Sequence, residues 1–282
     1  MLSDPVVSTE WLADHLEAPD LIVLDASWHL PTANRDAKAE YLAEHVPGAL
    51  FFDIDEIADI DSPLPHMLPS PEKFSSRMRR MGIGDGKRIV VYDSVGLFSA
   101  ARVWWMFRYF GHGDVAILDG GLKKWKAEGR PLEDGPPRRL QERHFTARVQ
   151  SMMLADKGEV EQAIAGKSSQ LADARSAPRF TGAEKEPRAG VRSGHMPGAH
   201  NVHYGSLLNP DGTLKDREEI RKIFEARGVD LSKPVITTCG SGVTAAILTL
   251  GLTQLGHNRH ALYDGSWAEW GLEGPTPVVT GE

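Results

Sequence analysis

The chain has very little cysteine: Cys239 is the only one among its 282 residues. A single thiol excludes an internal disulfide, a cysteine-rich zinc site and a CxxC redox pair. If Cys239 is reactive, the chain has no second thiol to resolve the group that it carries. We therefore expect an external molecule to accept that group.

Long apolar runs and an excess of positive charge are also missing. No stretch of 18 or more apolar residues is present, so we expect no membrane span. The net charge of −7 disfavours a nucleic-acid partner, because phosphate recognition needs a concentrated basic surface. The N-terminal segment resembles neither a signal peptide nor an arginine-rich transit peptide. Together these absences predict a cytoplasmic protein.

The sequence contains an internal repeat. HVPGA begins at His45 and HMPGA at His195, an offset of 150 residues. GHGDVAILDGGLKKW (111–125) matches GHNRHALYDGSWAEW (256–270) at an offset of 145, with its Asp-Gly pair and final tryptophan at the same spacing. Matching motifs in the same order indicate that the chain consists of two copies of one structural unit.

Each copy alternates β-rich runs with helical runs, and this order predicts a parallel sheet flanked by helices. The expected strands are the apolar runs 21–26, 88–93 and 115–120 in the first copy and 170–175, 234–239 and 260–265 in the second. The expected helices between them are 99–111 and 243–256. We predict two tandem α/β domains, 1–135 and 150–282, joined by a linker at 136–149.

Cys239 ends a predicted strand and is followed by the glycine-containing loop CGSGVT before a predicted helix. Ligands of α/β sheets gather at the carboxyl ends of strands. Gly240 and Gly242 allow the loop to turn its N–H groups inward, and such a loop beside a helix N-terminus favours an anion such as a thiolate.

A lone cysteine is more often a small buried hydrophobic residue than a nucleophile. The repeat argues against that interpretation here, because the equivalent position in the first copy is Asp93. A carboxylate would not normally replace a packing thiol. We therefore predict that the position faces a polar site, with a reactive group only in the second copy.

Two classes of cysteine enzyme share this strand–loop–helix arrangement. A phosphatase of the C-x5-R type would carry an arginine where this chain has Ala245, so that hypothesis lacks its phosphate-binding residue. A cysteine hydrolase would need a general base near the thiol. His45 and His195 are both compatible with that role by sequence, although only one copy has a cysteine.

The tandem HxPGA and DGG/DGSW motifs, with a cysteine loop only in the second copy, resemble the rhodanese superfamily over essentially the whole chain. CGSGVT, DGSWAEW, VLDASW (23–28) and FFDID (51–55) are most similar to its 3-mercaptopyruvate sulfurtransferase members. The resemblance implies two rhodanese-like domains, of which the first is inactive. Thiosulfate-using members typically carry basic residues where this loop has Gly240 and Ser241.

The resemblance also implies the site residues. Arg179 and Arg188 match the two arginines that grip the substrate carboxylate and carbonyl, and planar guanidinium groups suit that task. Ser241, His45 and Asp36 correspond to a relay that polarises the substrate, with the histidine contributed by the first domain. The remaining loop residues assigned to substrate binding are Gly240, Gly242, Val243 and Thr244.

The expected reaction is covalent sulfur transfer without a cofactor or metal. Cys239 takes the sulfur of 3-mercaptopyruvate as a persulfide, releases pyruvate, and passes the sulfur to a thiol, thioredoxin or cyanide. Two alternatives remain open on the same fold: a thiosulfate sulfurtransferase and a persulfide carrier that has no donor reaction of its own.

Overall fold

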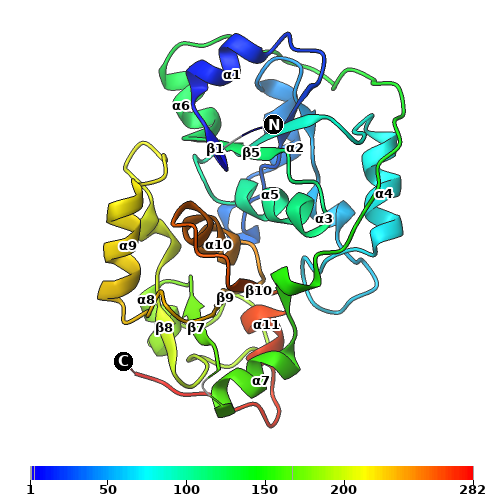
Figure 1. Ribbon diagram of the computed structural model, residues 1–282. Helices are drawn as coiled ribbons and strands as arrows, with labels where there is room; N and C mark the ends of the chain where they lie inside the picture. Colours follow the sequence, from blue (N-terminus) through cyan, green and yellow to red (C-terminus); the bar gives the residue numbers. More distant parts are fainter. Residues whose placement is uncertain (1, 3, 167, 282) are drawn as a thin grey trace. The chain divides into compact units, whose positions relative to one another are not determined.

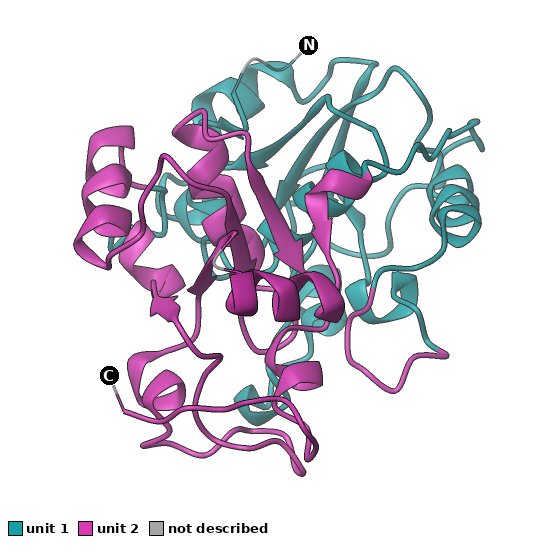
Figure 2. Cartoon of the chain, turned by 60° about the horizontal axis from the view of Figure 1, so that its bottom comes forward, with its two compact units in different colours: residues 1–60, 68–150, 208–214 teal, residues 61–67, 151–207, 215–282 magenta. Residues whose placement is uncertain are grey.

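The computed structural model describes residues 2, 4–166 and 168–281. The chain divides into two compact units, shown in different colours in Figure 2. Unit 1 comprises residues 1–60, 68–150 and 208–214, and unit 2 comprises residues 61–67, 151–207 and 215–282. Each unit therefore includes a short segment from the other half of the sequence.

Unit 1 contains a five-stranded sheet in the order β1-β5-β4-β2-β3, and all of its strand pairs are parallel (Figure 1). The strands are β1 (Val6–Val7), β2 (Leu21–Asp25), β3 (Leu50–Phe51), β4 (Arg88–Tyr92) and β5 (Val115–Leu118). The helices are α1 (Thr9–His15), α2 (Ala37–Ala43), α3 (Ile54–Ile57), α4 (Pro71–Arg80), α5 (Ala100–Tyr109) and α6 (Gly121–Ala127), with a 3-10 turn at Pro31–Ala33.

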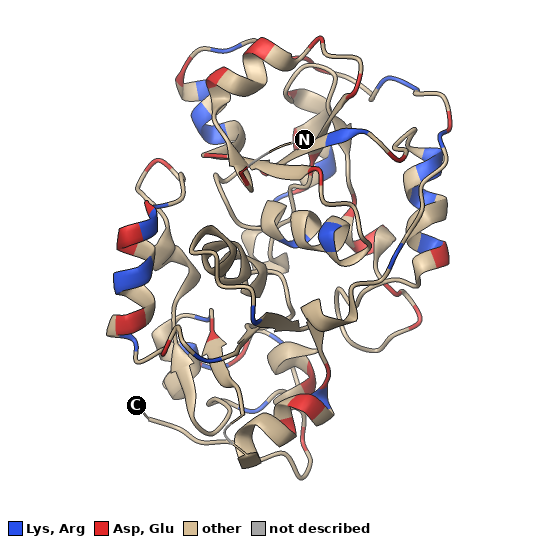
Figure 3. Cartoon of the chain, in the orientation of Figure 1, with Lys and Arg blue, Asp and Glu red and all other residues tan. Residues whose placement is uncertain are grey.

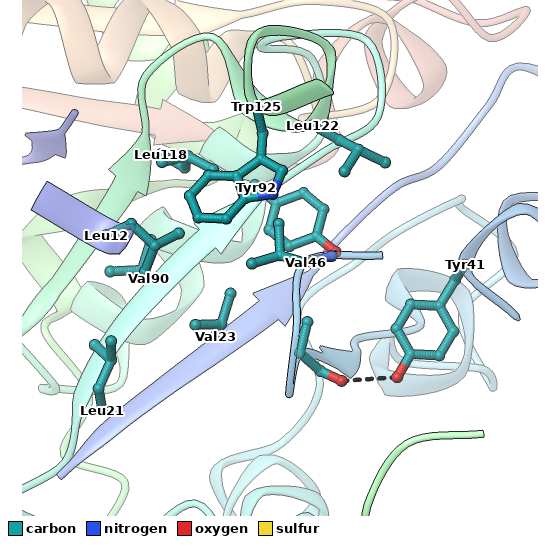
Figure 4. Close-up of a cluster of buried hydrophobic side chains, with 11 residues drawn as sticks. Leu12, Leu21, Val23, Tyr41, Val46, Val90, Tyr92, Leu118, Leu122 and Trp125 are labelled. Carbon is teal, nitrogen blue, oxygen red and sulfur yellow. Dashed lines mark hydrogen bonds between the residues drawn. The ribbon is translucent and has the colours of Figure 1, made fainter. Parts of the chain in front are cut away.

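Helices cover both faces of this sheet, which explains why its central strands are apolar on both sides. Alternate residues of β4 such as Val90 and Tyr92 pack with Leu12 of α1 and Trp125 of α6 in the cluster of Figure 4. Other aromatic residues of unit 1 pack in a second cluster, where Phe74 of α4 stacks 4.2 Å from Phe110.

Unit 2 has the same topology: its strands run in the order β6-β10-β9-β7-β8, again all parallel. The strands are β6 (Leu154–Ala155), β7 (Gln170–Asp173), β8 (Ala199–Asn201), β9 (Val235–Thr238) and β10 (His260–Tyr263). The helices are α7 (Lys157–Gly166), α8 (Ala177–Thr181), α9 (Arg217–Ala226), α10 (Ala245–Gln254) and α11 (Ser266–Trp270), with 3-10 turns at Ser151–Met153 and Tyr204–Leu207.

The predicted repeat and the predicted α/β fold are confirmed. The six strands expected from the sequence are β2, β4, β5, β7, β9 and β10, and the two expected helices are α5 and α10. The four edge strands β1, β3, β6 and β8 were not predicted, because runs of two or three residues carry too little periodicity to be recognised. Corresponding strands occupy corresponding places in the two sheets.

Charged residues of both signs alternate along the surface helices, as α9 shows in Figure 3. Ile220 and Phe224 form the buried side of that helix, so its charges face outward. Among the described residues, no helix has both the length and the apolar character that a membrane crossing requires.

The turn between β4 and α5 in unit 1 is organised by one carboxylate. The side chain of Asp93, which is 1% exposed, accepts hydrogen bonds from four backbone N–H groups. These donors belong to Val95 at 3.1 Å, Phe98 at 2.7 Å, Ser99 at 3.0 Å and Ala100 at 2.9 Å. Asp93 therefore satisfies the amides that a helix N-terminus leaves unpaired.

Replacing Asp93 with alanine should leave these buried donors without an acceptor. We expect the Asp93→Ala variant to lose about 2–4 kcal/mol of unfolding free energy, measured by urea denaturation. The control is Asp216→Ala. The Asp216 side chain caps α9 by accepting a hydrogen bond from the Glu219 N–H at 2.8 Å. A cap of this kind contributes about 1 kcal/mol. Equal losses in the two variants would contradict the role given to Asp93.

Candidate active site

Cys239 is the first residue after β9, and its side chain lies at the carboxyl end of the parallel sheet of unit 2. The residue is 2% exposed, and Ser241 in the same loop is 6% exposed. Gly242 has φ of +78°, a conformation that favours glycine, and the chain enters α10 at Ala245. The loop therefore presents a nearly buried thiol beside a helix N-terminus.

Helix α11 holds the beginning of this loop. The carbonyl groups of Cys239 and Gly240 accept hydrogen bonds from the N–H groups of Trp267 and Ala268, each at 2.9 Å. The Cys239 N–H donates to the Ser266 hydroxyl at 3.2 Å. These bonds use the first two carbonyls of the loop, so the backbone around the thiol is fixed from one side.

The next amides of the loop differ from their counterparts in unit 1. In the described part of the chain, no protein acceptor takes a hydrogen bond from the N–H groups of Val243, Thr244 or Ala245. The equivalent amides in unit 1 donate to the Asp93 carboxylate. Unit 1 thus holds an anion of its own at the turn, whereas unit 2 carries a thiol there and keeps these amides available.

The two predicted substrate arginines lie against this loop. A Cβ atom at Gly240 would lie 3.0 Å from Nη2 of Arg179 and 3.9 Å from Nη1 of Arg188. Arg179 comes from the short helix α8, and Arg188 follows in the loop after it. The structure therefore brings two guanidinium groups next to the residue that follows Cys239.

Arg179 is held in this position by a buried ion-pair network. Glu186, whose side chain is 4% exposed, accepts from Arg179 Nε at 3.3 Å and from Arg175 Nη1 at 2.7 Å. Arg175 also binds Asp173, with Nη2 2.7 Å from Oδ2. Burial alone would lower the pKa of Arg175, but the adjacent Asp173 and Glu186 carboxylates more than offset this and raise it. The Arg175 guanidinium therefore stays charged.

The other two predicted residues, His45 and Asp36, lie in unit 1. Nδ1 of His45 donates to the Tyr41 carbonyl at 2.7 Å, and the ring stacks on Tyr41 at 4.2 Å. In unit 2, His195 makes the same contacts with Phe180, at 2.9 Å and 3.7 Å. Both histidines thus hold the chain before a strand in the same way.

Asp36 caps helix α2, and its side chain accepts from the Ala39 N–H at 3.0 Å. Within the described residues, no hydrogen bond joins Asp36 to His45. The assignment of these two residues to a relay stays a prediction.

His66 is a further candidate residue that was not predicted from the sequence. It is 8% exposed, has a left-handed backbone with φ of +60°, and lies in the segment 61–67 that belongs to unit 2 with Cys239. Left-handed non-glycine residues are uncommon, and strained backbone concentrates at functional sites. The prolines at 63, 65 and 69 in SPLPHMLPS were the available signal, because they indicate a rigid loop around the histidine.

Comparisons with known proteins agree with this geometry. The sequence pattern of the rhodanese-like domain matches residues 8–128 and 156–273. Human 3-mercaptopyruvate sulfurtransferase is 43% identical over 98% of this chain and 95% of its own length. Bovine thiosulfate sulfurtransferase is 44% identical over 94% of this chain and 91% of its own length.

A solved structure is similar over nearly the same span. It is the crystal structure of SseA from Escherichia coli, a 3-mercaptopyruvate sulfotransferase with the rhodanese fold. This chain is 42% identical to it in sequence, and the two structures superpose with a TM-score of 0.86. The match covers 94% of this chain and 99% of that one. With both halves matching the same domain and the thiol loop in the second half, the chain belongs to the rhodanese family.

Proposed function

We propose that the chain is a sulfurtransferase that moves the sulfur of 3-mercaptopyruvate through a persulfide on Cys239 and releases pyruvate. The observation that carries this proposal is the contrast between the two turns. The turn of unit 1 binds the Asp93 carboxylate with backbone amides, and the same turn of unit 2 carries the thiol. A persulfide anion on Cys239 suits an amide-lined turn of this kind.

The proposed chemistry has two steps that balance. The Cys239 thiolate attacks the donor sulfur, so that a sulfur–sulfur bond forms and the carbon–sulfur bond breaks. The electron pair of the broken bond goes to carbon, which leaves as the pyruvate enolate and takes up a proton. An acceptor thiolate or cyanide then attacks the outer sulfur and regenerates the Cys239 thiolate.

Arg179 and Arg188 support 3-mercaptopyruvate as the donor. This donor carries a carboxylate and a keto oxygen, which two guanidinium groups can bind while the sulfur reaches the loop. Both groups lie beside Gly240, one residue from the thiol. Thiosulfate is the alternative donor, and identity alone does not decide between them, since relatives named for each donor are 43% and 44% identical. The uncharged Gly240 and Ser241 favour mercaptopyruvate.

Other parts of the proposal concern the partners of the reaction. We expect a thiol, thioredoxin or cyanide as the acceptor, because no other cysteine of the chain can take the sulfur. A cytoplasmic location also remains a prediction, and a relative from Arabidopsis thaliana is named as mitochondrial.

The persulfide can be observed directly. Protein incubated with 3-mercaptopyruvate and no acceptor should gain the mass of one sulfur atom, located on Cys239 by peptide mass spectrometry. The Cys239→Ser variant should gain none. Turnover of mercaptopyruvate should exceed that of thiosulfate by about tenfold or more in kcat/KM. The reverse preference would assign the alternative donor, and an unmodified Cys239 in active protein would exclude the persulfide.

The position of the arginines is tested by Gly240→Ala. The added methyl group would contact Arg179 at 3.0 Å and displace the end of a flexible side chain. We expect KM for mercaptopyruvate to rise about tenfold, because the displaced arginine binds the substrate less tightly. The Tm should change little. Gly113→Ala is the matched control, since nothing lies within 4 Å of a Cβ atom there. An unchanged KM in Gly240→Ala would contradict substrate binding by the pair.

The histidine of the proposed relay has two candidates, His45 and His66. His45→Asn removes a ring that packs as His195 does, so a purely structural role predicts a lower Tm and nearly unchanged kcat. His66→Asn retains a side chain that tolerates the left-handed backbone. If His66 is the relay residue, that variant should lose about 100-fold in kcat at unchanged Tm. The opposite pattern would assign the relay to His45.

A further inference from the structure

Unit 1 contains a cavity of about 290 Å³ at the carboxyl ends of β2 and β4. Its lining combines small polar groups with charged side chains. The residues used below are Asp25, Ser27, Arg35, Glu40, Leu122 and Lys126. The volume is at the lower end of the range for small-molecule sites.

Backbone hydrogen bonds identify the counterparts of these residues in unit 2. Phe52 N–H donates to the Asp25 carbonyl at 2.7 Å, and Val202 N–H donates to the Asp173 carbonyl at 2.9 Å. Asp25 and Asp173 each end a central strand, so Ser27 corresponds to Arg175.

The loop after β5 is related in the same way. Leu122 N–H donates to the Asp93 carbonyl at 3.0 Å, and Trp267 N–H donates to the Cys239 carbonyl at 2.9 Å. Leu122 therefore corresponds to Trp267.

In unit 2 this place is filled by one guanidinium group. Arg175 is 2% exposed, binds both oxygens of Asp173 and lies 4.3 Å over the ring of Trp267. In unit 1 the arginine is replaced by Ser27 and the ring by Leu122, which Figure 4 shows beside Tyr92 and Trp125. Both smaller residues line the cavity, so the cavity takes the place of the guanidinium and its stacking partner.

Unit 1 nevertheless has the carboxylate of this arrangement, which is that of Asp25. Asp25 is 2% exposed, and its Oδ1 accepts from the Ser27 N–H at 2.9 Å. Among the residues that the structure describes, no lysine or arginine pairs with Asp25. Burial raises the pKa of Asp25 to about 6, so its carboxyl is largely ionised at neutral pH without a counter-charge.

The cations at the edge of the cavity are already paired. Arg35 binds Glu40 through Nε at 2.7 Å, and Lys126 binds Glu44. The lining therefore carries one net negative charge when Asp25 is ionised, and that charge lies at the carboxylate that lacks its arginine.

We propose that this cavity binds a small organic cation, a molecule with a guanidinium or ammonium head group that pairs with Asp25. The bound head group takes the place that Arg175 occupies against Asp173. A guanidinium head group would pair with Asp25 as the Arg175 guanidinium pairs with Asp173, and an ammonium would supply the same charge. This site is lined by residues of unit 1 and includes none of the Cys239 loop.

The probe is methylguanidinium, added to the full chain at pH 7.5 and constant ionic strength, with binding followed by saturation-transfer NMR. Methylurea is the control, because it has the same shape and no charge. We expect saturable binding of methylguanidinium below about 50 mM and at least tenfold weaker binding of methylurea. Methylammonium tested in the same way distinguishes the two head groups.

Variants locate the site. Asp25→Asn should weaken methylguanidinium binding at least tenfold, and Ser27→Arg should abolish it, because the chain then supplies its own guanidinium. Leu122→Trp fills the cavity from the other side and should also abolish binding. It replaces Ser27→Arg as the test if that variant does not fold. Asp20→Asn is the control, because it removes a carboxylate that pairs with Arg88 outside the cavity. This variant should bind methylguanidinium as the unaltered chain does. The proposal is overturned if methylguanidinium and methylurea bind equally well, or if Asp25→Asn binds methylguanidinium as well as the unaltered chain does.

Discussion

The N–H groups where a central strand turns into a helix are the constraint on which both units depend. Parallel strands of a sheet flanked by helices bring such amides to one edge, and they need an acceptor there. Unit 1 supplies the Asp93 carboxylate, which accepts from four of them. Unit 2 supplies no carboxylate and places Cys239 at the same position, with α11 holding the first two loop carbonyls. One backbone framework thus holds a carboxylate at the turn of one unit and a thiol at the turn of the other.

Three pairs of equivalent residues show how the units differ around this framework. The pairs Asp93 and Cys239, Ser27 and Arg175, and Leu122 and Trp267 lie in equivalent backbone environments. In unit 2 the arginine anchors Glu186, which in turn holds Arg179 near the thiol loop. In unit 1 the arginine is absent, and a cavity with a buried carboxylate remains. Unit 1 therefore has a cavity where unit 2 has a packed ion pair.

Several features were predictable because they depend on local sequence. The strands of β4 and β9 are continuous apolar runs, and the turn after each is marked by the repeat itself. The position of Cys239 at a strand end follows from that pattern, as does the α/β topology. The edge strands β1 and β6 were not predictable, because two residues carry no periodicity and their place depends on pairing with β5 and β10. The flanking prolines indicate a rigid loop around His66, but the left-handed backbone of His66 was not predictable from them.

The repeat of two α/β units, and the presence of a thiol in only one of them, follow from the amino-acid sequence. Both conclusions rest on the order and spacing of motifs, which folding does not change. The three-dimensional structure was needed to show which groups meet: Arg179 and Arg188 lie beside Gly240, Asp93 accepts from the amides of its turn, and Asp25 lacks the arginine that Asp173 has. The arginines and Gly240 are far apart in the chain, so their contact depends on how the strands and helices of unit 2 pack. Asp93 and its donors are close in sequence, but their bonds depend on the fold of the turn between β4 and α5.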